Sequence, residues 1–135
     1  MGREQSTGTC EHCQEQFGYY LVHSGFNDSV YAYCDSCGKT ASLSLLNKRM
    51  PKLQDCPEYQ EMCSAMEPYV QPCGCGGSFK KGSAPRCPHC NKPLSPELAT
   101  TYIESNAPGA WRWQRNWSGL YCIVIQNKWI ADNFQ

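Results

Sequence analysis

Short stretches of alternating apolar and polar residues predict strands along much of the chain. Residues 17–24 and 29–33 are rich in aromatic and β-branched side chains and flank a turn at 25–28, so they predict a hairpin. Residues 40–45 alternate small polar and apolar side chains and predict a third strand, and 78–80 predict a short fourth one. The first part of the chain is therefore expected to be mostly β.

The C-terminal segment 111–135 is the most apolar part of the chain. Residues 120–125 form an unbroken apolar run, typical of a central strand, between two further strand-like segments at 111–117 and 129–131. Turn-forming residues separate the three segments. This pattern predicts a three-stranded antiparallel meander that supplies the core against which the rest of the chain packs.

One or two short helices are also expected. Within 57–69, apolar side chains spaced three, one and three residues apart suit one face of a short helix. Ser95 supplies an N-cap and Pro96 a first helical residue, and together they predict a helix that runs to about Glu104. The predicted fold class is α+β, mostly β.

The cysteine content changes this picture, because the chain is too small to rely on its core alone. It has 135 residues, 41% of them hydrophobic, and the segment 1–45 buries too little to fold alone. Eight of the eleven cysteines form four close pairs: Cys10/Cys13, Cys34/Cys37, Cys73/Cys75 and Cys87/Cys90. Two such turns brought together are typical of a structural Zn²⁺ site with four thiolate ligands.

Taken in chain order, the four pairs predict two zinc ribbons. Cys10, Cys13, Cys34 and Cys37 are expected to close the first site, with the segment 14–33 between the two pairs. Cys73, Cys75, Cys87 and Cys90 are expected to close the second, with the segment 76–86 between them. Glycines beside the C-x-C pair allow a sharper turn that points amide N–H groups at sulfur. The expected cofactors are two structural Zn²⁺ ions, each contributing on the order of 10 kcal/mol to folding.

The order of these motifs divides the chain into five segments. We expect a flexible tail at 1–9, a first ribbon at 10–45, a linker with a short helix at 46–69 and a second ribbon at 70–94. Residues 95–135, the helix and the meander, are expected to pack with the ribbons as one compact unit.

Disulfides and iron are the alternatives to zinc. An odd number of cysteines cannot all pair within one chain, and the polar N-terminus carries no apolar signal segment. No apolar run is long enough to span a membrane. These features favour the reducing cytoplasm, where disulfides do not persist. Two cysteine turns also suit rubredoxin-type iron, but the C-x-C pair and the unequal sites favour zinc.

Several motifs resemble those of a known family. The turns Cys10-x-x-Cys13, Cys34-x-x-Cys37-Gly38 and Cys87-Pro-His-Cys90 look like zinc-ribbon turns. The sequence of residues 73–94 is similar to sequences of small bacterial zinc-ribbon proteins of unassigned function. This resemblance implies a structural ion and a role in binding protein or nucleic acid, and it does not choose between them.

The net charge of the chain bears on the choice between a protein and a nucleic-acid partner. The chain carries 12 basic and 12 acidic side chains, and eight thiolates with two Zn²⁺ ions add a net charge of −4. A neutral to acidic protein is not typical of a general nucleic-acid binder. We therefore expect a non-enzymatic module that binds another protein as an adaptor, inhibitor or neutralising partner. Its candidate contact residues are Trp111, Arg112, Trp113, Arg115 and the acidic residues Asp55, Glu58 and Glu61.

Other functions are less well supported by the sequence. Nucleic acid is the main alternative, bound by the aromatic segment 111–117 and by the basic residues Lys80, Lys81, Arg86 and Lys92. A thiol redox switch, in which oxidation of the cysteines ejects zinc, is a third hypothesis. Of the cysteines outside the pairs, Cys56 and Cys63 could be redox-active, although a structural role is favoured, and Cys122 lies in an apolar strand and is expected to be buried. Catalysis is not expected, because both sites are complete with cysteine and no His–Glu or Ser-His-Asp set is present.

Overall fold

The computed structural model contains two β-sheets and one α-helix in the part of the chain that it describes, namely residues 5–23, 29–44, 48, 64–107, 121–126, 129–130 and 133. Sheet A has the order β1-β2-β6 and sheet B the order β5-β3-β4-β7. All neighbouring strands are antiparallel except β4 and β7, which are parallel. The predicted α+β, mostly β class is confirmed.

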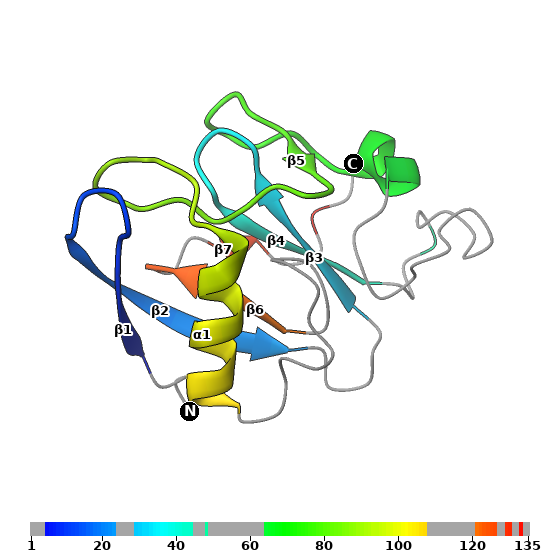
Figure 1. Ribbon diagram of the computed structural model, residues 1–135. Helices are drawn as coiled ribbons and strands as arrows, with labels where there is room; N and C mark the ends of the chain where they lie inside the picture. The colour runs from blue at the N-terminus through cyan, green and yellow to red at the C-terminus, as the bar shows by residue number, and fades with distance from the viewer. Residues whose placement is uncertain are drawn as a thin grey trace.

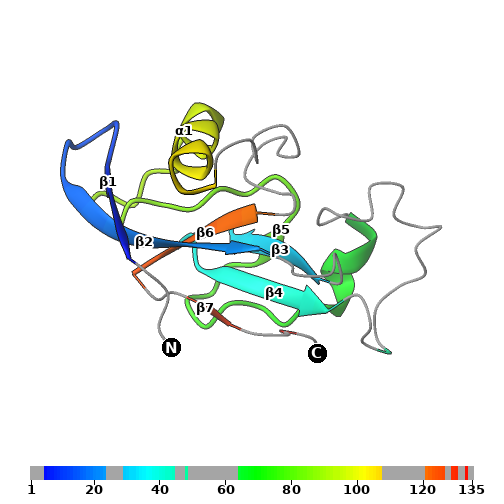
Figure 2. The same ribbon diagram turned by 90° about the horizontal axis from the view of Figure 1, so that it is seen from below.

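The strands of sheet A come from distant parts of the chain. They are β1 (Ser6–Thr9), β2 (Gln16–His23) and β6 (Tyr121–Ile125). Sheet B contains β3 (Ser29–Cys34), β4 (Thr40–Ser44), β5 (Phe79–Lys80) and β7 (Trp129–Ile130). Figure 2 shows α1 on one side of sheet A and β4 and β7 of sheet B on the other.

Three sequence predictions about strand pairing are wrong. The segments predicted as a hairpin, β2 and β3, lie in different sheets. The predicted C-terminal meander is also divided, because β6 pairs with β2 and β7 pairs with β4. Residues 6–9 are not a tail but form strand β1, in which Gly8 lets Phe17 and Tyr102 approach closely. A Cβ atom at Gly8 would lie 2.9 Å from Phe17 Cε1 and 2.9 Å from the Tyr102 hydroxyl oxygen.

The predicted helix is confirmed as α1 (Pro96–Asn106). Ser95 holds the N-cap position with Pro96 after it, but the Ser95 side chain makes no capping hydrogen bond. Instead, the Ser95 N–H donates to the Glu11 carboxylate at 2.6 Å, which ties the helix start to the loop after β1. Of the helix expected within 57–69, the described part is the 3₁₀-helix η2 (Ser64–Tyr69), which contains Pro68.

Two tyrosine hydroxyls cover the two edges of sheet A. The Tyr102 hydroxyl, from α1, donates to Thr9 O at 3.1 Å and accepts from Thr9 N–H at 3.2 Å. The Tyr33 hydroxyl, from sheet B, donates to Ile123 O at 3.0 Å and accepts from Ile123 N–H at 3.2 Å. Each hydroxyl thus takes the place of a neighbouring strand, satisfying an edge that would otherwise be exposed.

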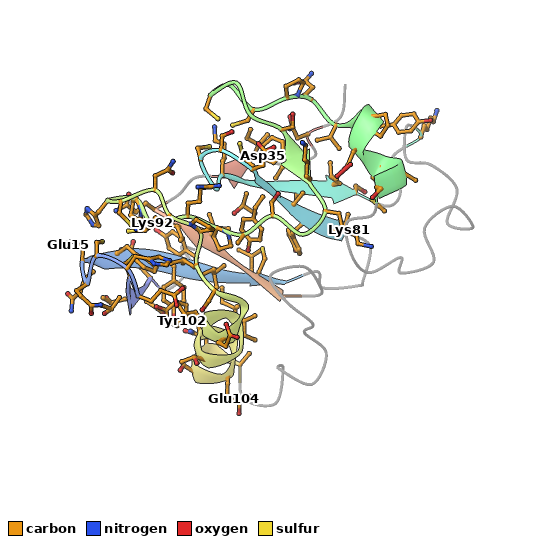
Figure 3. All side chains as sticks on the ribbon, turned by 45° about the horizontal axis from the view of Figure 1, so that its top comes forward. Glu15, Asp35, Lys81, Lys92, Tyr102 and Glu104 are labelled. Carbon is orange, nitrogen blue, oxygen red and sulfur yellow. The ribbon has the colours of Figure 1, made fainter. Side chains whose placement is uncertain are left out.

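The core has two parts, with Cys10 and Cys87 buried in the first and Cys34 and Cys73 buried in the second. The first lies around sheet A and α1, where Tyr19 and Tyr102 stack at a centroid distance of 4.9 Å. In Figure 3, Tyr102 lies where α1 meets sheet A. The second lies between sheet B and η2 and includes Val30, Leu43 and Met66. No helix among the described residues is long and apolar enough to cross a membrane.

Candidate metal centres

Eight cysteines converge into two groups of four. Their turns are the first (residues 10–15), second (34–39), third (73–77) and fourth (87–92). The outer site combines the first and fourth turns through Cys10, Cys13, Cys87 and Cys90, and the inner site combines the second and third through Cys34, Cys37, Cys73 and Cys75. In Figure 1 the dark-blue loop accordingly lies beside the yellow-green loop, and the cyan loop beside the green loop.

This arrangement corrects the pairing predicted from chain order, although the eight residues are the same. The predicted ribbons at 10–45 and 70–94 are not separate metal units, because each contributes one turn to each site. The physical reason is the strand pairing. β5 pairs with β3, with Phe79 opposite Cys34, and this places the third turn against the second. The first and second turns adjoin β2 and β3, which belong to different sheets.

The sulfur atoms of each group are spaced as a tetrahedral ion requires. In the outer site Cys10 Sγ lies 3.7 Å from Cys90 Sγ, and Cys13 Sγ lies 3.7 Å from Cys87 Sγ. In the inner site the corresponding distances are 3.5 Å for Cys34–Cys75 and 3.6 Å for Cys37–Cys73. Four sulfurs at about 2.3 Å from one Zn²⁺ lie about 3.8 Å apart. The described cysteines form no disulfide, so each group can hold a metal ion.

The three C-x-x-C turns share one backbone conformation. In each, the N–H of the first cysteine donates to the carbonyl five residues later, and the N–H of the residue four positions later donates back to the cysteine carbonyl. That fourth residue has positive φ in every case: Gln14 at 66°, Gly38 at 74° and Asn91 at 60°. A glycine therefore follows only one of these turns, and glutamine and asparagine adopt the left-handed region in the other two.

The C-x-C turn is the same turn with one residue removed. Cys73 N–H donates to Gly77 O, and Gly76 N–H donates to Cys73 O, one position earlier than in the other turns. Gly76 has φ of 98°, and a Cβ atom at Gly77 would lie 2.7 Å from Cys34 Sγ. The Gly77 N–H points at Cys75 Sγ at 3.4 Å. These glycines serve the purpose predicted from the sequence.

The thiol pKa is lowered at one cysteine of each site. Burial opposes ionisation of Cys10, but the N–H groups of Cys13 and His12, with neighbouring thiols, lower its pKa to about 6. The Gly77 N–H, followed by neighbouring thiols, lowers the pKa of Cys75 to about 7. Burial is the largest factor that raises the pKa of Cys34 to about 12. Four thiolates this close repel one another, so full ionisation requires a cation at the centre.

Two histidines link the turns of the outer site reciprocally. His12 Nε2 donates to Pro93 O at 3.1 Å, and His89 Nε2 donates to Gln16 O at 2.9 Å. Each carbonyl belongs to the sixth residue after the first cysteine of the opposite turn. Both histidines are exposed and lie outside the ligand set. Hydrogen bonds of this kind orient the ligands around a metal.

The inner site is supported by Asp35 and is more open than the outer site. Asp35 N–H donates to Ser78 O, and its carboxylate accepts from Ser78 N–H at 2.9 Å and faces Lys80 Nζ at 3.4 Å. The Ser78 N–H and then Lys80 lower the pKa of Asp35. Cys75 is exposed, whereas every ligand of the outer site is buried or half-buried. Asp35 lies at the β5 end of sheet B in Figure 3.

Some of the other residues singled out in the sequence lie outside the described part of the chain, and others are placed by the structure. The predicted partner residues Trp111, Arg112, Trp113, Arg115, Asp55, Glu58 and Glu61 lie outside the described residues, as do Cys56 and Cys63. Cys122 is fully buried in β6, as predicted. Arg86, which the sequence placed in a basic patch, instead donates two hydrogen bonds to backbone carbonyls, a role that no sequence pattern announced.

Metal affinity should rise steeply with pH. The Glu15 N–H favours the Cys13 thiolate, but burial and then the neighbouring thiols together raise the pKa of Cys13 to about 12, and the pKa of Cys90 is also raised. The pKa values of Cys34 and Cys73 are raised in the inner site, chiefly by burial. Each site thus releases at least two protons on binding near neutral pH, so affinity should fall about 100-fold per unit of decreasing pH. Chelator competition between pH 6 and 8 measures this, and a pH-independent affinity would contradict it.

The fold and the two sites define a small, mostly β protein with two nested groups of four cysteines, each able to hold a metal ion. The chain belongs to the DUF8255 family, a domain of unknown function whose model matches residues 6–96. The match includes all eight clustered cysteines and ends at the start of α1. Comparisons with curated proteins and with solved structures found no match.

Proposed function

We propose that both sites bind Zn²⁺ and that the ions are structural. The observation that carries this proposal is the completeness of each group: four sulfurs lie within 4.8 Å of one another. Four thiolates satisfy tetrahedral Zn²⁺ and leave no position for water or substrate, which is typical of structural and not catalytic zinc. The protein is therefore proposed to be non-enzymatic. The thiols also suit iron, which a colour distinguishes from colourless zinc.

Metal analysis tests the zinc proposal directly. Protein purified under reducing, zinc-replete conditions should contain two zinc ions per chain and little iron. Replacement by Co²⁺ should give the intense visible absorption of tetrahedral thiolate coordination at both sites. Chelation should abolish the near-ultraviolet circular dichroism of the packed aromatic core, because each ion joins turns that are far apart in sequence. A red, iron-containing protein, or one that keeps its fold without metal, would contradict the proposal.

We further propose that the zinc-bound protein works in a reducing cytoplasm as a module that binds another protein. The lack of disulfides among the described cysteines supports the compartment. Two bases of the predicted basic patch are used within the molecule: Lys80 pairs with Asp35, and Arg86 binds backbone carbonyls. This use weakens the nucleic-acid alternative. The predicted tryptophan segment remains a candidate for the contact.

The described surface adds a second candidate for that contact beside the inner site. Tyr69 of η2 is 45% exposed. Next to it is a groove of about 320 Å³ between η2 and β5, lined by Glu67, Pro68, Val70, Pro72, Ser78, Phe79 and Lys80. Exposed tyrosine beside a groove with apolar and charged lining residues is typical of a protein-binding hot spot.

Replacing Tyr69 should weaken partner binding without loss of fold. We expect zinc-loaded protein to capture a defined partner from nuclease-treated lysate of its source organism, and Tyr69→Ala to reduce that affinity at least about tenfold. Glu97→Ala, at an exposed position of α1, is the matched control and should bind normally. Capture that disappears with nuclease would favour nucleic acid, and equal binding by both variants would place the contact elsewhere.

A further inference from the structure

Arg86, the residue before Cys87, joins a turn of the outer site to a turn of the inner site. Arg86 Nη1 donates to Asn91 O at 2.7 Å, within the fourth turn. Arg86 Nη2 donates to Asp35 O at 2.8 Å, in the second turn. One guanidinium group therefore joins the backbone of a turn that supplies the outer site to the backbone of a turn that supplies the inner site.

Two further contacts reinforce this junction. The side-chain amide of Asn91 donates to Ser36 O at 3.0 Å. Asn91 is also the positive-φ residue of its turn, so its backbone and its side chain depend on the same conformation. On the opposite side, a Cβ atom at Gly38 would lie 2.3 Å from Arg86 N, so only glycine permits this approach. The second and fourth turns thus meet backbone to backbone.

The junction can form only when both turns are folded, and each turn depends on its ion. The turns are held by N–H···S contacts and by the ion that joins each to a remote partner turn. A metal ion that orders the second turn therefore places the carbonyls of Asp35 and Ser36 where Arg86 and Asn91 need them. By thermodynamic reciprocity, an ion in the outer site must favour the inner site equally.

The inner site lies within the chain loop that the outer site closes, and this nesting also makes binding at one site favour binding at the other. The outer site closes the long chain loop between Cys13 and Cys87. With the inner site filled, the connection runs only from 13 to 34 and from 75 to 87, which is less than half as long. The smaller loop-closure entropy favours the outer site about threefold. This contribution does not depend on Arg86.

We propose that Arg86 and Asn91 couple the two sites, so that the protein takes up and releases its two metal ions together. The inference rests on the proposed function, that both sites bind metal. Its consequence is a steep response: over a narrow range of free zinc, the chain passes from two disordered sites to two ordered ones. Asp35, which supports the inner site, and Lys80, which lines the groove beside η2, become ordered in the same step.

Native mass spectrometry at half-saturation with Zn²⁺ tests the coupling. For two equal sites without coupling, the species with one ion makes up about half of the protein, and tenfold coupling lowers it to about a quarter. We expect a low one-zinc share in the wild type and a clear rise in Arg86→Gln, which loses the contact with Asp35. Lys92→Gln removes the same charge at the other end of the fourth turn and should behave as the wild type.

The outcomes separate the inference from the proposal on which it rests. A one-zinc share in Arg86→Gln equal to that in Lys92→Gln would overturn the coupling while both sites still bind zinc. Failure of the wild type to bind two zinc ions would overturn the proposed function, and the inference with it. As an independent readout, chelator-driven zinc release should show one phase in the wild type and two in Arg86→Gln. Two phases in the wild type would also contradict the coupling.

Discussion

Replacing cysteines in pairs should show which turns share an ion. Cys10→Ala is expected to remove one of the two zinc ions. Cys10→Ala/Cys87→Ala should still retain one, because both residues belong to the outer site. Cys10→Ala/Cys34→Ala should retain none at moderate zinc, because it damages both sites. Each lost site removes on the order of 10 kcal/mol of binding free energy that holds the fold together.

Pairing in chain order gives the opposite result and is the hypothesis to exclude. It predicts that Cys10→Ala/Cys34→Ala keeps one ion and that Cys10→Ala/Cys87→Ala keeps none. Zinc content of the purified variants, measured by mass spectrometry at the same moderate zinc concentration, distinguishes the two arrangements. Cys122→Ala is a suitable control, because Cys122 is a buried core residue outside both groups and its replacement should leave two ions bound.

The sequence predicted where strands and helices begin and end better than it predicted which strands pair. The bounds of β2, β3, β4 and α1 agree with the predicted segments to within about two residues, because alternation and helix-start signals are local. Which strands pair is not a local property. The short connection between β2 and β3 favoured a hairpin, but β2 instead takes β1 and β6 as neighbours, with apolar residues buried along its length. Tertiary packing overrode the short connection.

The eight clustered cysteines could be predicted because candidate metal-binding turns are short sequence motifs, whereas which turns come together depends on the topology of the sheets. One overlooked signal does distinguish the sites. The first and fourth turns both have histidine before the second cysteine, in Cys10-Glu-His-Cys13 and Cys87-Pro-His-Cys90, and the other two turns do not. The reciprocal hydrogen bonds of His12 and His89 explain why the outer site uses that residue twice. Pairing the two turns that share this histidine would have grouped the cysteines correctly.

The nested arrangement also explains how so short a chain forms two sheets. The inner site fixes the second and third turns beside β3 and β5, and the outer site fixes the first and fourth turns beside sheet A. An ion bound in each site would thereby anchor one part of the core. The hydroxyl of Tyr33, a residue of β3, bonds to Ile123 of β6 and so connects the two sheets without a clustered cysteine, which makes this contact a second place where the fold is sensitive.

Tyr33→Phe should destabilise the zinc-loaded protein by about 1–3 kcal/mol. Tyr33 and Ile123 are both fully buried, and burial raises the pKa of Tyr33 well above its usual value, so the hydroxyl stays protonated and able to donate. Without it, Ile123 N–H loses its partner in a place where water cannot replace it. The Thr40 hydroxyl donates to Ile123 O at 3.5 Å, so it supplies a partner for the carbonyl but none for the Ile123 N–H.

Urea unfolding at fixed, saturating zinc measures this effect, because metal occupancy is then the same in every variant. Tyr69→Phe removes a hydroxyl from an exposed ring and should change the free energy of unfolding by less than about 0.5 kcal/mol. Tyr102→Phe should lie between the two, because its partner Thr9 is exposed and water can reach that edge of sheet A. If Tyr33→Phe and Tyr102→Phe had equal effects, burial of the β6 edge would not be what makes Tyr33 important, and the two sheets would be joined chiefly by their apolar side chains.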